Sequence, residues 1–169
     1  MNLKDFFLDE LEREGALARK AVERVPDHRT DWKPHPKSMP LGYLSTLVAI
    51  MPSWVVMTVE HDEFDIKSKE AMEYTPKIYE TSRELVEVAD QSIARAREAL
   101  QKTTEEHLLK PWKFLVAGHL VSQDPRWVVL RDSVFNHLSH HRGQLTVYLR
   151  LNDVKVPSMY GPTADEQGF

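Results

Sequence analysis

The sequence predicts an all-α protein built as a four-helix bundle. Four segments of the 169-residue chain repeat apolar residues at helical spacing. Two long connections separate these segments, and the chain carries little of the two-residue alternation that is typical of strands. A chain of this length suits one hydrophobic core, so we expect residues 1–169 to form a single domain.

The first predicted helix covers residues 2–24, where charged residues separate the apolar positions and Pro26 ends the element. The second covers residues 40–60. That segment is apolar on most faces, so we expect it to be deeply buried. Pro52 stands in its middle and is expected to kink or divide it, because a proline removes one helical hydrogen bond.

Residues 76–102 are predicted as the third helix, with Pro76 in its first turn and Thr75 as its cap. An apolar stripe that ends at Leu100 supplies the helical period. The preceding residues, 61–75, are predicted as a charged connection between the second and third helices.

Residues 126–151 are predicted as the fourth helix, which Pro125 introduces. The segment before it, residues 103–124, fits a short hairpin and an irregular excursion equally well. The residues after the helix contain proline and glycine and have no period, so we expect an extended tail that wraps the bundle.

Composition excludes several classes of function. The formal net charge is -4 and the pI is about 6.1, which provides no electrostatic footprint for nucleic acid or anionic lipid. Cysteine is absent, so any metal must be bound by His, Asp or Glu. Acidic residues interrupt the N-terminal segment and no apolar run is long enough to cross a bilayer, so we expect a cytoplasmic protein.

Three histidines gather in the middle of the fourth predicted helix. His137 and His141 are four residues apart, so they share one helix face and both can reach one metal ion. A pair at this spacing is a weak motif by itself, and the alternative is a helix face whose histidines bond their neighbours. His140 points about 60° to 100° away from the pair, which places it beside the site or at the surface.

The residues that follow the histidines also suggest roles. Arg142, like His140, is a candidate for supporting the pair or orienting an anionic substrate. Gly143 costs about 1 kcal/mol relative to alanine inside a helix. Close packing against another helix is the simplest reason to find a glycine there.

Two longer stretches make the chain resemble a known family. They are "DWKPHPKSMPLGYLSTLVAIMPSW" and "HLSHHRGQLTVYLRLNDVKVPSMYGPTADE". Together they resemble the DinB-like superfamily, which includes damage-inducible DinB proteins and bacterial thiol-dependent transferases. The resemblance covers nearly the whole chain. It implies up-down-down-up connectivity, frequent homodimers, and zinc or nickel on three histidines, two of which map onto His137 and His141.

The resemblance also exposes a departure in the second helix. The family's third histidine falls on Leu47, and a carboxylate often found three residues later falls on Ile50. Leucine has no lone pair for a metal, so the sequence predicts a degenerate site with two histidines. Two histidines completed by water bind a divalent metal weakly, because affinity depends on ligand number and fixed geometry.

Three functional hypotheses follow from these residues. The first is a metal-dependent enzyme of the thiol-transferase kind, in which the metal lowers the pKa of a bound thiol or water. The second is a metal-free module on the same fold that binds a small molecule or an interaction partner beside Leu47. The third is a structural or dimer-forming bundle whose histidines are ordinary polar surface. No phosphate-binding loop or nucleophile-elbow motif supports another chemistry.

Overall fold

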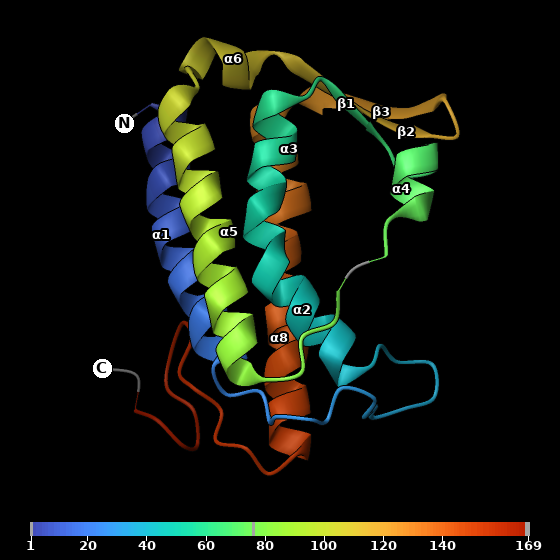
Figure 1. Cartoon of the computed structure of the whole chain (residues 1–169). Coiled ribbons are helices and arrows are strands. Elements are labelled where there is room, and N and C mark those ends of the chain that lie inside the picture. The colour runs from blue at the N-terminus through green and yellow to red at the C-terminus, as the bar shows by residue number, and fades with distance from the viewer. Residues whose placement is uncertain (1, 76, 168–169) are drawn as a thin grey trace.

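The computed structural model describes residues 2–75 and 77–167 and contains four long helical segments that pack side by side (Figure 1). The first and fourth run in one direction, and the second and third run in the opposite direction. The four segments are α1 (Leu3–Val22); α2 (Leu41–Ile50), η1 (Met51–Ser53) and α3 (Trp54–Glu60) in succession; α5 (Ser82–Lys102); and α7 (Arg126–Val129), η2 (Leu130–Asn136) and α8 (His137–Leu151) in succession.

A three-stranded mixed sheet lies at one end of the helices, so the all-α prediction is wrong (Figure 1). Its strands are β1 (Glu63–Asp65), β2 (Pro111–Val116) and β3 (His119–Pro125), in the order β1-β2-β3. β1 pairs with β2 in parallel and β2 pairs with β3 antiparallel. The sequence does not predict the sheet, because β1 has only three residues, which are too few to show an alternating pattern. Its partner strand β2 also lies about fifty residues away in the sequence.

The carboxylate of Asp65 in β1 bonds the tip of the hairpin that β2 and β3 form. Ala117 and Gly118 form the tip with positive φ angles of 52° and 78°, as a two-residue hairpin turn requires. The backbone N–H groups of both residues donate to Asp65, at 2.9 and 2.6 Å. Residues 103–124 therefore contain a short helix, α6 (Glu105–Leu109), followed by the hairpin.

The helix α5 begins later in the sequence than predicted, because a capping box fixes its first turn. The helix begins at Ser82 rather than near residue 76, and Thr81 forms a capping box with Glu84. Pro76 lies outside the described residues. Thr75 caps no helix, and the charged connection before it contains β1 and the short helix α4 (Lys69–Glu73).

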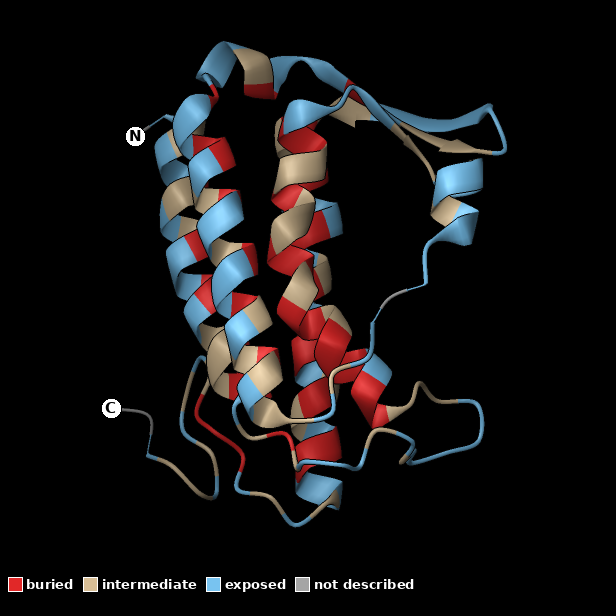
Figure 2. Ribbon diagram, viewed as in Figure 1, coloured by how far each residue is buried: buried red, intermediate tan, exposed pale blue. Residues whose placement is uncertain are grey.

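The core consists of two apolar clusters on the inward faces of the long helices (Figure 2). One is centred on α2 and α8, and the other on α3, α5 and η2. Trp54 packs against both clusters from the point where α3 begins after the Pro52 turn. The segment Leu41–Glu60 is long and apolar enough to cross a membrane, but 61% of its most apolar window is buried, as in a core helix.

A buried arginine attaches the sheet to the helices. Arg126, at the start of α7, is only 1% exposed. Its guanidinium donates to the carbonyls of Thr58 at 3.1 Å, His61 at 3.1 Å and Pro111 at 2.8 Å, and it pairs with Asp62. The end of α3, β1 and β2 are thereby held to the start of the last helical segment.

Candidate functional site

His137 and His141 face each other at the start of α8. Their Nε2 atoms are 2.8 Å apart and their ring centroids 4.6 Å apart. His141 is 8% exposed, whereas His137 is half-buried. The helical spacing that predicts a shared face is therefore realised as direct contact between the two rings.

Gln144 sets the proton arrangement of this pair. His141 Nδ1 is 2.8 Å from the side-chain oxygen of Gln144, and an amide oxygen can only accept. Nδ1 therefore carries the proton, and the Nε2 atom of neutral His141 has a free lone pair. A hydrogen bond between the two Nε2 atoms then requires His137 Nε2–H as its donor.

Burial keeps His141 neutral. Loss of solvent around the ring lowers the pKa of His141 below its ordinary value, and the charges of His137 and His140 lower it further. The hydrogen bond to Gln144 opposes this shift but does not reverse it. The His141 ring is thus neutral at neutral pH, and its Nε2 atom can accept a hydrogen bond.

An aromatic side chain of α3 packs against the pair. Trp54 lies against His137, with ring centroids 5.7 Å apart. Leu47, seven residues before Trp54, lies roughly 10 Å further along the helix. Because α2 and α8 are antiparallel, that distance brings Leu47 roughly level with Gln144. Leu47 and Ile50 are both half-buried, and Leu47 packs against the core.

Arg142 points to the opposite side of α8, toward α1. Its guanidinium pairs with the Glu14 carboxylate at 2.6 Å and donates to the Glu14 carbonyl at 3.1 Å. Both side chains are at least nine-tenths buried. Tyr160 of the tail donates to the same carboxylate at 2.8 Å, and so does Ser139 at 3.1 Å. The structure does not bring Arg142 together with the histidine pair.

His140 is exposed and lies edge-on to His141, at 5.1 Å between ring centroids. It is close enough to touch a ligand at the edge of the pair. Gln144, Trp54 and Glu14 are the contacts that sequence analysis does not assign. Only Gln144 has a detectable signal, because its position three residues after His141 places it on the same helix face.

Ion pairs and hydrogen bonds of the C-terminal tail account for the end of the second stretch that carries the family resemblance. Arg150 pairs with Asp165, and both Lys20 and Arg24 pair with Glu166, at 3.0 and 2.8 Å. The residues after α8 therefore hold the tail against α1 and α8 through Tyr160, Asp165 and Glu166.

The residues around the pair do not fit a three-histidine metal centre. The two Nε2 atoms are nearly as close as two ligands of one ion, which would lie roughly 3 Å apart. The sequence resemblance, however, assigns the third ligand to Leu47, whose side chain is a hydrocarbon. Within residues 2–75 and 77–167, no group of three His, Asp or Glu side chains could hold a metal ion.

Comparison with known proteins yields one family. The sequence profile of the DinB family matches residues 7–167. A solved DinB-like protein from Bacillus cereus superposes with a TM-score of 0.71 at 21% identity, over 91% of this chain and 95% of that one. A DinB-like protein from Bacillus subtilis gives 0.67 at 16% identity, over 90% and 95%. At these identities the likeness shows the fold, and the search of curated proteins finds no match.

Gly143 allows a direct test of the site helix. Among the described residues, no atom outside the adjacent turns of its own helix lies within 4 Å of a Cβ built at this position, so the expected packing against another helix is wrong. We expect Gly143→Ala to raise the free energy of unfolding by about 0.5–1 kcal/mol, measured with urea. Gly42→Ala is the matched control and should destabilise, because its Cβ would lie 2.7 Å from Thr30. A destabilising Gly143→Ala would contradict the described packing of α8.

The lowered pKa of His141 predicts a pH dependence of stability. In the unfolded chain a histidine titrates near 6.5, whereas the folded state resists protonation. The stabilising contribution is therefore complete above about pH 6.5 and is lost as the pH falls toward the lower folded pKa. The urea midpoint should fall less between pH 7.5 and 5.5 in His141→Gln than in the parent protein. Equal falls in both proteins would rule out a depressed pKa.

Proposed function

The chain belongs to the DinB family, and from that premise we propose that it binds a small molecule with a neutral hydroxyl or thiol head at the His137–His141 pair, without a resident metal ion. The observation that carries this proposal is the contact between the two Nε2 atoms at 2.8 Å, with Gln144 holding the proton on His141 Nδ1. An acceptor fixed in this way can bind an O–H or S–H donor in place of His137.

The environment of the pair favours an uncharged head. Burial lowers the pKa of His141, so this ring is a poor cation and a poor partner for a carboxylate. Arg142, the nearest arginine on the same helix, is committed to Glu14.

Metal dependence has less support than binding without a metal. Leu47 supplies no ligand, and two imidazoles with water give weak, exchangeable binding. The resemblance to thiol-dependent transferases then suggests that the head group of the ligand is a thiol or hydroxyl, and does not require a metal-activated reaction. Homodimer formation and a cytoplasmic location stay predictions from the sequence.

Ligand binding at the pair can be tested with octan-1-ol by isothermal titration calorimetry. We expect His141→Phe to weaken binding by about tenfold, because the lost hydrogen bond is worth about 1.4 kcal/mol. His119→Phe makes the same exchange on the exposed hairpin and should leave the affinity unchanged. Equal affinities for the parent and His141→Phe would refute the proposed contact.

The missing third ligand can be tested by restoring it. We expect Leu47→His to tighten zinc binding by roughly a hundredfold, because it adds the imidazole that the family's site requires. The double variant Leu47→His, His141→Ala should lose that gain. If Leu47→His binds zinc no better than the parent, Leu47 does not face the pair and the site is wrongly mapped.

A further inference from the structure

We propose that residues 160–167 of the C-terminal tail form a salt-sensitive strap that regulates the histidine pair. The docked strap holds α8 in the rotation that buries His141 and places His137 against Trp54, and its release frees that rotation. This inference rests on the function proposed above and adds the regulation of its site. It follows from how the tail is anchored and from the tail residue that reaches the Arg142–Glu14 pair.

The tail returns from the end of α8 toward α1 and has a buried root (Figure 1). Asp153 turns the chain with a φ of 59°, and residues 156–158 are buried. Val156 belongs to the core cluster centred on α2 and α8. Among residues 160–167, by contrast, none is buried. The root is therefore part of the core, whereas the strap depends on polar contacts.

Two adjacent carboxylates close the strap onto its root. Asp165 accepts the backbone N–H of Val156 at 2.8 Å, and Glu166 accepts that of Ser158 at 3.0 Å. Thr163 positions both acidic residues, because its hydroxyl oxygen accepts their backbone N–H groups at 3.1 and 3.0 Å. The amide protons of Val156 and Ser158 are therefore protected while the strap is closed.

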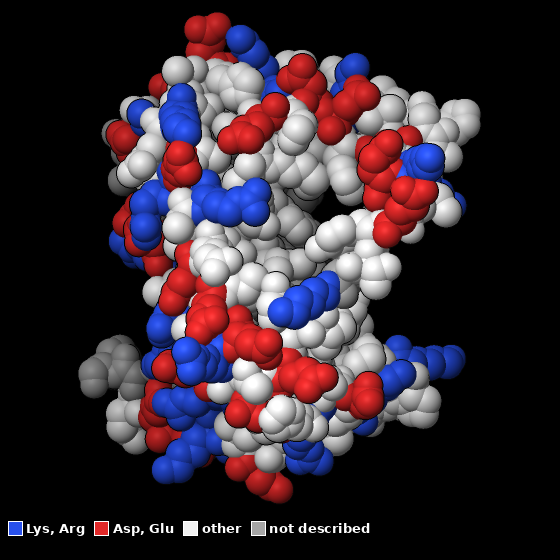
Figure 3. All heavy atoms as spheres, viewed as in Figure 1, with Lys and Arg blue, Asp and Glu red and all other residues white. Residues whose placement is uncertain are grey.

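The same carboxylates attach the strap to two long helices. Asp165 pairs with Arg150 of α8, and Glu166 pairs with Lys20 and Arg24 of α1. These five side chains are between 17% and 48% exposed. Figure 3 shows basic and acidic side chains crowded together at the lower end of the molecule, where Figure 1 places the tail. Salt screens partly exposed ion pairs, because the Debye length falls from about 10 Å at 0.1 M to about 3 Å at 1 M.

Tyr160 connects the strap to α8. Its hydroxyl donates to the Glu14 carboxylate at 2.8 Å, and the Arg142 guanidinium lies over its ring, 5.2 Å from the centroid. Tyr160 is 72% exposed, whereas Glu14 and Arg142 are buried, so the phenol covers the ion pair from outside. When the strap leaves, Glu14 loses a hydrogen-bond donor and water reaches the pair, which weakens the contact that fixes the rotation of α8.

The surroundings of the histidine pair depend on that rotation. His141 is 8% exposed, and His137 lies against Trp54 at 5.7 Å between ring centroids. Because Arg142 directly follows His141, any turn of α8 about its axis moves both side chains together. Release of the strap therefore moves His137 relative to the indole, whose ring current makes the His137 ring signals a reporter of the change.

Amide hydrogen exchange, measured by NMR, tests the strap on the unaltered protein. When NaCl is raised from about 0.1 to 1 M, we expect the Val156 and Ser158 amides to exchange about tenfold faster. The Leu108 amide, which bonds the Thr104 carbonyl at 3.1 Å at the opposite end of the molecule, should keep its rate. Val156 and Ser158 rates as insensitive to salt as that of Leu108 would overturn the strap.

A strap variant tests the regulation. The double variant Asp165→Asn, Glu166→Gln removes both charges and keeps the shapes of the side chains. At about 0.1 M NaCl, its Val156 and Ser158 amides should exchange as fast as those of the parent at 1 M, and its His137 ring signals should shift and broaden. Faster exchange with parent-like His137 signals would overturn the regulation.

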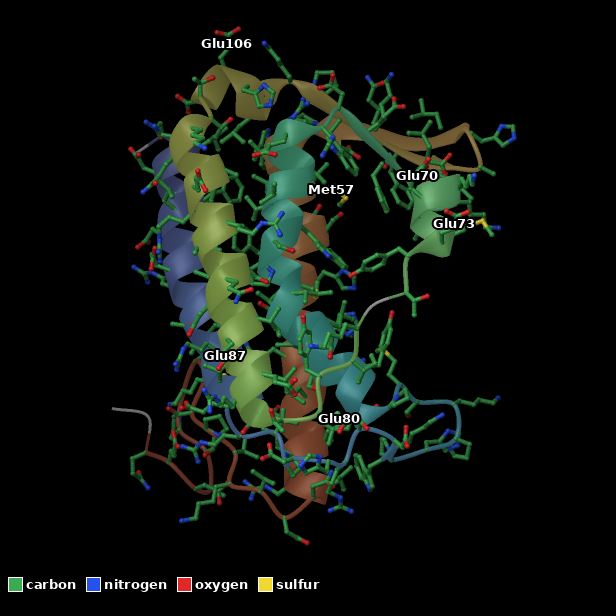
Figure 4. All side chains as sticks on the ribbon, in the orientation of Figure 1. Met57, Glu70, Glu73, Glu80, Glu87 and Glu106 are labelled. Carbon is green, nitrogen blue, oxygen red and sulfur yellow. The ribbon has the colours of Figure 1, made fainter. Side chains whose placement is uncertain are left out.

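A second double variant is the matched control. Glu87→Gln, Glu106→Gln removes two ion pairs, with Arg83 and Lys110, and changes the net charge by the same amount. Figure 4 places Glu87 on α5 and Glu106 at the end of the molecule opposite the tail. We expect parent-like exchange and parent-like histidine signals. Circular dichroism confirms the fold of each variant, and the salt series needs no variant.

Tyr160→Phe tests the link between the strap and α8. This variant keeps the ring over Arg142 and the charges of the strap, but it loses the donor to Glu14. The His137 signals should shift, while the exchange rate of the Val156 amide stays within about twofold of the parent. Unmoved His137 signals would show that Tyr160 does not connect the strap to the site, and would overturn the regulation.

The regulation and the proposed function fail in different ways. Octan-1-ol is titrated into the parent, His141→Phe and the strap variant, and the strap variant should bind at least about threefold more weakly than the parent. If His141→Phe weakens binding while the strap variant keeps the parent's affinity, the regulation is overturned and the proposed function stands. If octan-1-ol does not bind the parent while the strap variant still moves the His137 signals, the proposed function is overturned and the coupling of the strap to α8 stands.

Discussion

The buried ion pair between Arg142 and Glu14 is the constraint on which the site depends. Two charges held out of water are stable only when each is fully paired, and here Tyr160 and Ser139 complete the carboxylate's contacts. Adjacent helical residues point about 100° apart, so fixing Arg142 toward α1 also fixes the rotation of α8. His141 is thereby directed away from Glu14, and His137 on the same face meets Trp54. Arg142 therefore affects the site indirectly, because its ion pair fixes how α8 packs against α1.

The same rotation explains why the candidate site is neutral. His141 is buried, and the loss of solvent around its ring lowers its pKa. Gln144 then selects one tautomer and leaves one lone pair free. The two imidazoles contact each other directly through their Nε2 atoms, at 2.8 Å.

Sequence reasoning recovers the parts of this protein that depend on local periodicity. The first helix, the turn at Pro52 and the shared face of His137 and His141 all follow from spacing or from proline chemistry. It fails where distant segments decide the outcome. β1 forms because Glu63–Asp65 pairs with the hairpin strand β2. The helix α5 begins after Thr81, where Thr81 and Glu84 form a capping box, and not near residue 76 as predicted. Glu14 could not be assigned as the partner of Arg142, because nothing local links two residues so far apart.

The central claim is that His141 is a neutral hydrogen-bond acceptor for His137, and that this pair does not hold a resident metal. Long-range ¹H–¹⁵N correlation of the histidine side chains measures the state of each ring nitrogen directly. At neutral pH, the account predicts His141 protonated on Nδ1 alone, and both Nε2 signals unchanged by equimolar zinc at micromolar concentration. Zinc that shifts both Nε2 signals at equimolar addition, or a metal that copurifies on them, would contradict it.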